Sequence, residues 1–96
     1  MKDRGIISGT VVISGCGHDF GKVYVVVSER ESFLYLCDGD KRTLGNPKKK
    51  RRKHVTPIGQ IPGAEEWFES LKNLPVPLQG SEIRKRIRST MDCHED

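Results

Sequence analysis

The residues whose types and spacing most clearly indicate a chemical role form one basic segment. From Lys41 to Lys53 there are eight Lys and Arg residues and no acidic one, whereas residues 1–40 (four basic, six acidic) and residues 54–96 (five basic, seven acidic) each sum to −2. Like charges this close repel one another, so the chain tolerates them only in water or against a polyanion. The segment therefore predicts either a phosphate-contacting surface or a solvated loop or hinge. Pro47 followed by six basic residues also fits the short, weakly diagnostic pattern of a nuclear import signal.

A second group of reactive side chains consists of Cys16, His18 and Asp19. It is the only grouping of a nucleophile, a base and an acid in the sequence, but neighbours along a turn rarely converge on one substrate atom, so no enzymatic activity is expected. The pairs Cys16-x-His18 and Cys93-His94 lack the ligand spacing of structural zinc sites. Three cysteines, an odd number, argue against a disulfide framework. We expect no catalytic residue, no metal and no cofactor.

Residues 15–22 are typical of a turn, because three of these eight residues are glycines. Gly21-Lys22 could be mistaken for the end of a phosphate-cradling Walker loop. However, a valine-rich strand follows it instead of a helix, so nucleotide hydrolysis is not predicted. We expect Gly21 to be a backbone requirement, either through a positive φ or through the close approach of another chain segment.

Short β-branched and aromatic runs predict five strands in the first part of the chain. Three lie at residues 10–14, 23–27 and 33–37, a further strand starts at 42–44, and residues 54–58 form the fifth. The basic run falls between the fourth and fifth strands. Asp38-Gly39 is a typical hairpin pair. Five short strands joined by glycine-bearing turns predict a small curled sheet or barrel over residues 1–58.

Residues 59–96 differ in character and predict a helical C-terminal extension. After a linker at 59–63, apolar residues at helical spacing predict a helix over 64–74 that packs on the barrel through Trp67 and Phe68. Pro75 and Pro77 should end it, and Ser81 is expected to cap a second helix. That helix has a narrow apolar stripe of Ile83, Ile87 and Met91. It could be a second basic surface or an exposed, frayed tail.

Composition limits the class of protein. Ninety-six residues with 34% hydrophobic and 31% charged residues are enough for one small domain with a thin core. No run of eighteen apolar residues exists, so no membrane span is expected. The start, Met1-Lys2-Asp3-Arg4, leads into a mixed segment instead of the apolar stretch of a signal peptide. These features predict a cytoplasmic protein.

Residues 8–39 resemble a KOW motif. The resemblance consists of Gly9–Ser14, the glycine-rich turn ending in Gly21-Lys22, and the valines that follow, with Gly21 in the place of the motif's hallmark glycine. Asp38-Gly39, Arg42, Asn46-Pro47-Lys48-Lys49-Lys50 and His54 extend it, so that residues 5–58 look like the bacterial KOW-domain RNA-binding proteins. These are small relatives of archaeal- and eukaryotic-type large-subunit ribosomal proteins. The resemblance implies an SH3-like five-stranded barrel that binds structured, ribosomal RNA in a bacterial cytoplasm. Residues 59–96 lie outside it.

The sequence therefore predicts a non-enzymatic, ribosome-associated RNA-binding module. The candidate RNA-binding residues are Lys22, Lys41, Arg42, Asn46, Lys48, Lys49, Lys50, Arg51, Arg52, Lys53 and His54. Recognition is expected mainly through shape and backbone, because the deep groove of A-form RNA gives little access to base edges. Tyr24, Phe33 or Tyr35 could stack on an unpaired base or pack in the core.

Partners other than RNA are also considered. Ribosomal proteins are further candidate partners, no membrane contact is expected, and the chain should be a monomer. Lys49, Arg51 and Arg52 should be replaceable by Gln with little change in stability, because exposed like charges add little to folding. The alternative is an SH3-like protein-interaction module, which would have an exposed aromatic groove and a basic segment without a binding role.

Overall fold

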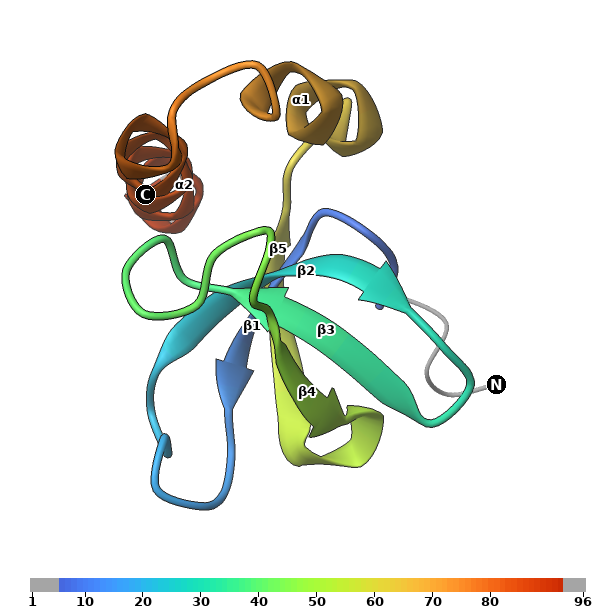
Figure 1. Ribbon diagram of the computed structural model, residues 1–96. Helices are drawn as coiled ribbons and strands as arrows, with labels where there is room; N and C mark the ends of the chain where they lie inside the picture. Colours follow the sequence, from blue (N-terminus) through green and yellow to red (C-terminus); the bar gives the residue numbers. More distant parts are fainter. Residues whose placement is uncertain (1–5, 93–96) are drawn as a thin grey trace.

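A computed structural model describes residues 6–92 of the chain. In this range an antiparallel five-stranded sheet precedes two helices (Figure 1). The strands are β1 (Thr10–Ser14), β2 (Val23–Glu29), β3 (Phe33–Cys37), β4 (Lys48–Arg51) and β5 (Val55–Gln60), and the helices are α1 (Ala64–Leu71) and α2 (Val76–Asp92). The strand order is β4-β3-β2-β1-β5. The mainly β architecture predicted from the sequence is confirmed.

The sheet curls so that its two edge strands approach each other at one end. β4 and β5 lie at opposite edges of the strand order, yet only the three-residue 3-10 turn η1 (Arg52–His54) connects them. The pairing also shifts register between Val11 and Val12 of β1 and between Val26 and Ser28 of β2. Such irregularities bend a strand and increase its twist.

Most strand predictions agree with the structure. β1 and β3 have the predicted bounds, and β2 runs two residues beyond the predicted end. The fifth strand begins at Val55 and continues to Gln60, so that Gly59 and Gln60 belong to the sheet and not to a linker.

The prediction for the fourth strand is wrong. Residues 42–44 form no strand but part of a turn, in which Thr43 and Asn46 make an isolated bridge. The fourth strand is instead the basic run, whose residues Lys48 to Arg51 pair with β3. Lys and Arg have modest strand propensity, but β3 is apolar or aromatic throughout, and pairing with β4 satisfies the backbone groups at its edge. A charged edge strand also discourages pairing with other chains.

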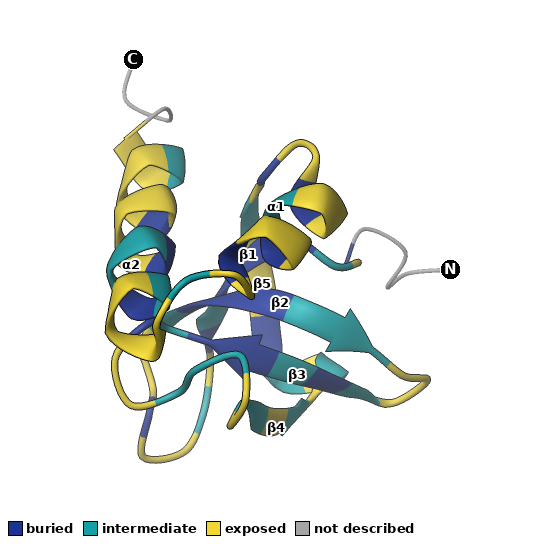
Figure 2. Cartoon of the chain, turned by 45° about the horizontal axis from the view of Figure 1, so that its top comes forward, coloured by how far each residue is buried: buried dark blue, intermediate teal, exposed yellow. Residues whose placement is uncertain are grey.

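The two faces of the sheet contact two separate apolar clusters. On the helix face, Val11, Val25 and Cys37 pack against the C-terminal part of the chain. The residues from that part are Ile61, Ala64, Phe68, Leu71, Ile83 and Ile87. The opposite face contributes Val12, Tyr24, Val26, Leu34 and Leu36, which Ile6 and Val55 complete. In Figure 2 the central strands are largely buried while the outward sides of both helices are exposed.

Helix α1 packs on the sheet as predicted. Phe68 is 6% exposed and belongs to the helix-face core, and the partly buried Trp67 packs against the same core. The two rings lie 5.1 Å apart, and the guanidinium of Arg86 sits 4.9 Å from the Trp67 ring. The helix ends at Leu71, three residues before the predicted end at 74.

Helix α2 begins five residues earlier than predicted. It runs from Val76, so Ser81 lies inside the helix and does not cap it. Pro77 is tolerated because it lies in the first turn, where the backbone N–H groups have no intrahelical partner. Ile83 and Ile87 are buried and Met91 is 40% exposed. The frayed-tail interpretation is therefore wrong for the described helix.

A close backbone contact fixes α2 to the loop after β3. A methyl group on Gly80 would collide with the carbonyl oxygen of Gly39, and one on Gly39 would collide with that of Gly80. Arg84 also donates a hydrogen bond to the Gly39 carbonyl. Neither helix of residues 6–92 combines the length and apolar character needed to cross a membrane.

Replacing Phe68 by Ala should lower the free energy of unfolding by about 3–5 kcal/mol, because it leaves a cavity between α1 and the sheet. Trp67→Ala should have a smaller effect, since its indole is only partly buried. Urea unfolding measures both, and Glu66→Ala, an exposed change on the same helix, is the control. Equal midpoints for Phe68→Ala and Glu66→Ala would rule out the docking of α1.

Candidate nucleic-acid interface

The basic strand β4 divides its side chains between the two faces of the sheet. In the register with β3, Arg51 lies opposite Phe33 and Lys49 opposite Tyr35, while Lys50 and Lys48 lie opposite Leu34 and Leu36. Because side chains alternate along a strand, Lys49 and Arg51 share the helix face and Lys48 and Lys50 share the other. The basic run is thus two rows of cations with different surroundings.

On the helix face the cations lie against aromatic rings. The Lys49 ammonium is 4.3 Å from the centre of the Phe33 ring, and the Arg51 guanidinium is 5.1 Å from it. Arg30 lies 6.0 Å from the ring of Tyr35. Lys49 and Arg51 are exposed, so their charged groups are held in place yet remain open to a ligand.

On the opposite face the cations converge on Asp19. The Lys50 ammonium is 2.9 Å from one carboxylate oxygen, and the Ser14 hydroxyl donates to the same oxygen at 3.0 Å. The Tyr24 hydroxyl donates to the second oxygen at 3.2 Å, and the Lys48 ammonium lies 3.7 Å from it. Since Asp19 is 8% exposed, this network is shielded from solvent.

The network shifts the protonation equilibria of its members. Burial acts to raise the pKa of Asp19, but hydrogen bonds from Lys50 and Ser14 and the charge of Lys50 outweigh it and lower the pKa to about 2. Burial, followed by the negative charge of Asp19, raises the pKa of Tyr24 to about 12. At neutral pH Asp19 is therefore charged and Tyr24 is a neutral hydrogen-bond donor.

Lys50 also joins the glycine-rich turn to the edge strand. Besides its contact with Asp19, its ammonium donates to the Cys16 carbonyl at 3.0 Å. The turn is tied further by the Gly21 N–H, which donates to Ser14, and by the Lys22 N–H, which donates to Asp19, both at 2.9 Å. Gly21 has φ +87°, so the predicted positive φ is confirmed, and its surroundings are open, so no segment packs closely on it.

Five of the predicted site residues line one surface pocket of about 380 Å³. These are Lys22 from the end of the glycine-rich turn, Lys41 and Arg42 from the loop after β3, and Lys48 and Lys50 from β4. Asp19 and Asp38 also line it, which leaves five cations against two carboxylates. Within residues 6–92, no carboxylate forms an ion pair with Lys22, Lys41 or Arg42. The pocket is suited to bind an anion.

Arg52 has a structural role that the sequence did not indicate. Its guanidinium donates to the carbonyls of Ile6, Arg30 and Glu31 at 2.8–3.0 Å and lies 3.6 Å from the carboxylate of Glu29. The premise that Arg52 is exposed is wrong, because its side chain is 13% exposed. We now expect Arg52→Gln to lower stability, since the change would leave these acceptors without their donor.

The remaining predicted residues lie outside the pocket. Lys53 and Asn46 are exposed, and His54 is partly exposed. The backbone N–H of Asn46 donates to Thr43 at 3.0 Å, and the carbonyl of His54 accepts from Gly15 at 2.8 Å. Their side chains remain candidates for RNA contact. The pair Cys93-His94 lies outside the described residues.

Sequence reasoning missed Phe20, which is 72% exposed. A signal was present, because an aromatic residue between Asp19 and Gly21 sits in a turn too short to enclose it.

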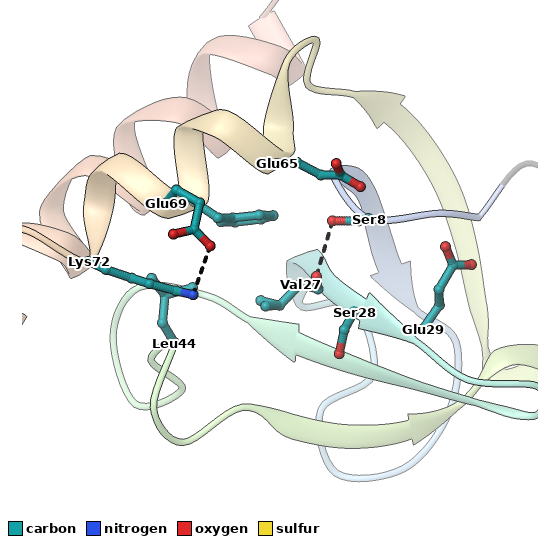
Figure 3. Close-up of a pocket in the computed structure, with 9 residues that line it drawn as sticks. Ser8, Val27, Ser28, Glu29, Leu44, Glu65, Glu69 and Lys72 are labelled. Atoms are coloured by element: carbon teal, nitrogen blue, oxygen red, sulfur yellow. Dashed lines mark hydrogen bonds and ion pairs between the residues drawn. The ribbon is translucent and has the colours of Figure 1, made fainter.

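A larger hollow of about 630 Å³ lies between α1 and the end of β2 (Figure 3). Its floor includes Val27, Leu44 and Phe68, and its rim carries Glu29, Glu65 and Glu69 together with Lys72. Lys72 lies 3.1 Å from Glu69 and leaves Glu29 and Glu65 without a cation on this rim, so the hollow is acidic overall. The hollow would repel a polyanion, whereas the basic pocket would attract one.

Asp19→Asn should destabilise the protein by about 2 kcal/mol at pH 7, and the difference from the parent should shrink as the pH falls. A carboxyl whose pKa is lowered on folding stabilises above its ordinary pKa of 3.8, and this contribution is lost as the pH falls toward about 2. Urea unfolding at pH 7, 4 and 2.5 measures it. Asp40→Asn, an exposed neighbouring carboxylate, should change stability by less than about 0.5 kcal/mol. A pH-independent difference for Asp19→Asn would exclude this role.

Comparisons with known proteins leave the family open. No protein-family model matches the chain, and no curated protein matches it. The resemblance of residues 5–58 to the KOW-domain proteins therefore stays a prediction.

Proposed function

We propose that this chain is a non-enzymatic RNA-binding module that holds the phosphate backbone of structured RNA. The observation that carries the proposal is the gathering of five cations from three separate segments in one pocket. Residues as distant in sequence as Lys22 and Lys50 contribute to it. A pocket of this kind would replace several condensed counterions at once, which is the main source of affinity for nucleic acid.

Lys49 and Arg51, on the opposite face of β4 from the pocket cations Lys48 and Lys50, offer a second row of cations. Lys49 and Arg51 are two residues apart on a strand, and so about 6–7 Å apart along it. Their contacts with Phe33 restrict both side chains before any ligand binds. This preorganisation reduces the entropy lost when they contact phosphates.

The finer fold assignment belongs to the same proposal. We take the curled sheet to be an SH3-like barrel of the KOW type. Its strand order, the 3-10 turn between β4 and β5, and the sequence resemblance support this assignment. Fold alone does not establish function, so the RNA assignment depends on the charged surface.

The proposal includes the cellular setting expected from the sequence. The chain would act in the cytoplasm as a monomer, associated with ribosomal RNA and neighbouring ribosomal proteins. The alternative, a protein-interaction module, requires an exposed aromatic groove. The aromatic residue that lines the hollow beside α1 is Phe68, which is buried, so that alternative receives less support.

Replacing Lys49 and Arg51 by Gln should weaken RNA binding and make it less sensitive to salt. Each lost phosphate contact lowers the slope of log affinity against log salt by about 0.7–0.9, so the double variant should lose about 1.5 units. Stability should change by less than about 0.5 kcal/mol, since both side chains are exposed. The measurement is a titration of a folded ribosomal RNA fragment at several salt concentrations.

The matched control is the double variant Lys72→Gln, Lys85→Gln. It removes the same charge from two exposed positions, Lys72 just after α1 and Lys85 in α2, where each Lys pairs with a Glu three residues earlier. The control should keep the parent's slope within about half a unit, because neither residue is on the proposed surface. Equal slopes for the parent and both double variants would contradict the proposal.

A further inference from the structure

Phe20 is the most exposed large apolar side chain in the described part of the protein. It is 72% exposed, compared with 58% for Val76, the next in rank. It lies in the glycine-rich turn between β1 and β2. A phenyl ring left in water contributes little to folding, and its faces are open to stacking.

The turn holds Phe20 in a defined position. Its backbone N–H donates to the Gly17 carbonyl at 3.1 Å, and its neighbour Asp19 is fixed by Ser14, Tyr24 and Lys50. These contacts come from three strands, β1, β2 and β4, as well as from the turn itself. The backbone that carries the ring is thus ordered before a ligand arrives, which lowers the entropy lost on binding.

Phe20 also lies next to the basic pocket. Gly17, His18, Asp19 and Lys22 all line that pocket, although Phe20 does not. The Cα atoms of Phe20 and Lys22 are two residues apart and therefore at most about 7.6 Å from each other. The ring and the pocket cations are therefore carried by adjoining positions of one turn, so neighbouring parts of one RNA strand could contact both.

The other aromatic rings of residues 6–92 are occupied. Lys49 and Arg51 lie on Phe33, Arg30 on Tyr35, and Arg86 on Trp67. Tyr24 and Phe68 are buried. Among the described residues, Phe20 alone combines an exposed ring with no recorded contact from another ring or a cation. A stacking partner could reach it without displacing anything.

We propose that Phe20 stacks on an unpaired base of the bound RNA while the adjoining phosphate lies in the basic pocket. The inference rests on the proposed RNA-binding function and specifies its substrate. The preferred RNA has at least one unpaired nucleotide, in a loop or a bulge, beside a folded stem. A uniform duplex keeps its bases stacked internally and offers Phe20 no free base face.

The test compares two RNAs and two substitutions at one position. A ribosomal RNA hairpin with an open loop is titrated alongside a blunt duplex of the same stem sequence. Phe20→Ala should weaken hairpin binding about 5- to 150-fold, because stacking on an aromatic side chain contributes that much per base. Duplex binding and the salt slope should stay unchanged, since no cation is removed. Phe20→Trp should retain hairpin affinity.

Controls separate stacking from other effects. Leu78→Ala removes an apolar side chain of 52% exposure on α2 and should leave hairpin affinity unchanged. A fluorescent base analogue is placed at each loop position in turn. At the position of the stacked base, the parent protein should quench its fluorescence and Phe20→Ala should not. Parent-like hairpin binding by Phe20→Ala would overturn the stacking proposal and leave the RNA-binding function standing. Equal weakening of hairpin and duplex would also overturn it, and failure of the parent to bind either RNA would overturn both proposals.

Discussion

The contact between Lys50 and Asp19 is the interaction on which the arrangement of the basic surface depends. It joins an edge strand to a turn more than thirty residues away, at 2.9 Å and largely out of water. A carboxylate in that position would be costly if it stood alone, and so would the cation. Because Ser14 and Tyr24 donate to the same carboxylate, the charge is shared over several donors. One anion thus holds Lys48 and Lys50 in place, while the other three pocket cations form no ion pair within residues 6–92.

Much of the sheet could be predicted because its strands carry a local signal. The β-branched and aromatic runs of β1, β2 and β3 determine their positions with little help from the rest of the chain. β4 could not be found in this way, because its four residues are all Lys or Arg. Its strand conformation comes from pairing with β3, a tertiary effect that composition does not reveal. The start of α2 was missed for a related reason, since Pro77 can end one helix or sit in the first turn of another.

The candidate site was predictable in part. Charge density pointed to a segment that supplies four of the five cations of the pocket, but it treated the six cations from Lys48 to Lys53 as equivalent. The structure gives them distinct surroundings: aromatic rings for Lys49 and Arg51, a buried carboxylate for Lys50, and backbone carbonyls for Arg52. Side chains alternate between the two faces of β4, and the register with β3 determines which face each one occupies. Which cation is free for a ligand therefore follows from the fold. The exposed Phe20 is similarly a consequence of how the turn is held.

The backbone contact between Gly39 and Gly80 links the pocket to a part of the chain that contributes no residue to it. Lys41 and Arg42 lie two and three residues after Gly39, and the loop that carries them rests on α2. A chain ending before α2 would keep every cation of the pocket in its sequence but would lose the support that positions two of them. Each glycine is therefore required on its own account, because a Cβ at either position would meet a backbone carbonyl that no substitution at the other position removes. Loop length should vary least between Cys37 and Arg42. The C-terminal helix α2 thus holds the loop in its conformation. Homologues that keep the basic pocket should therefore also keep this helix.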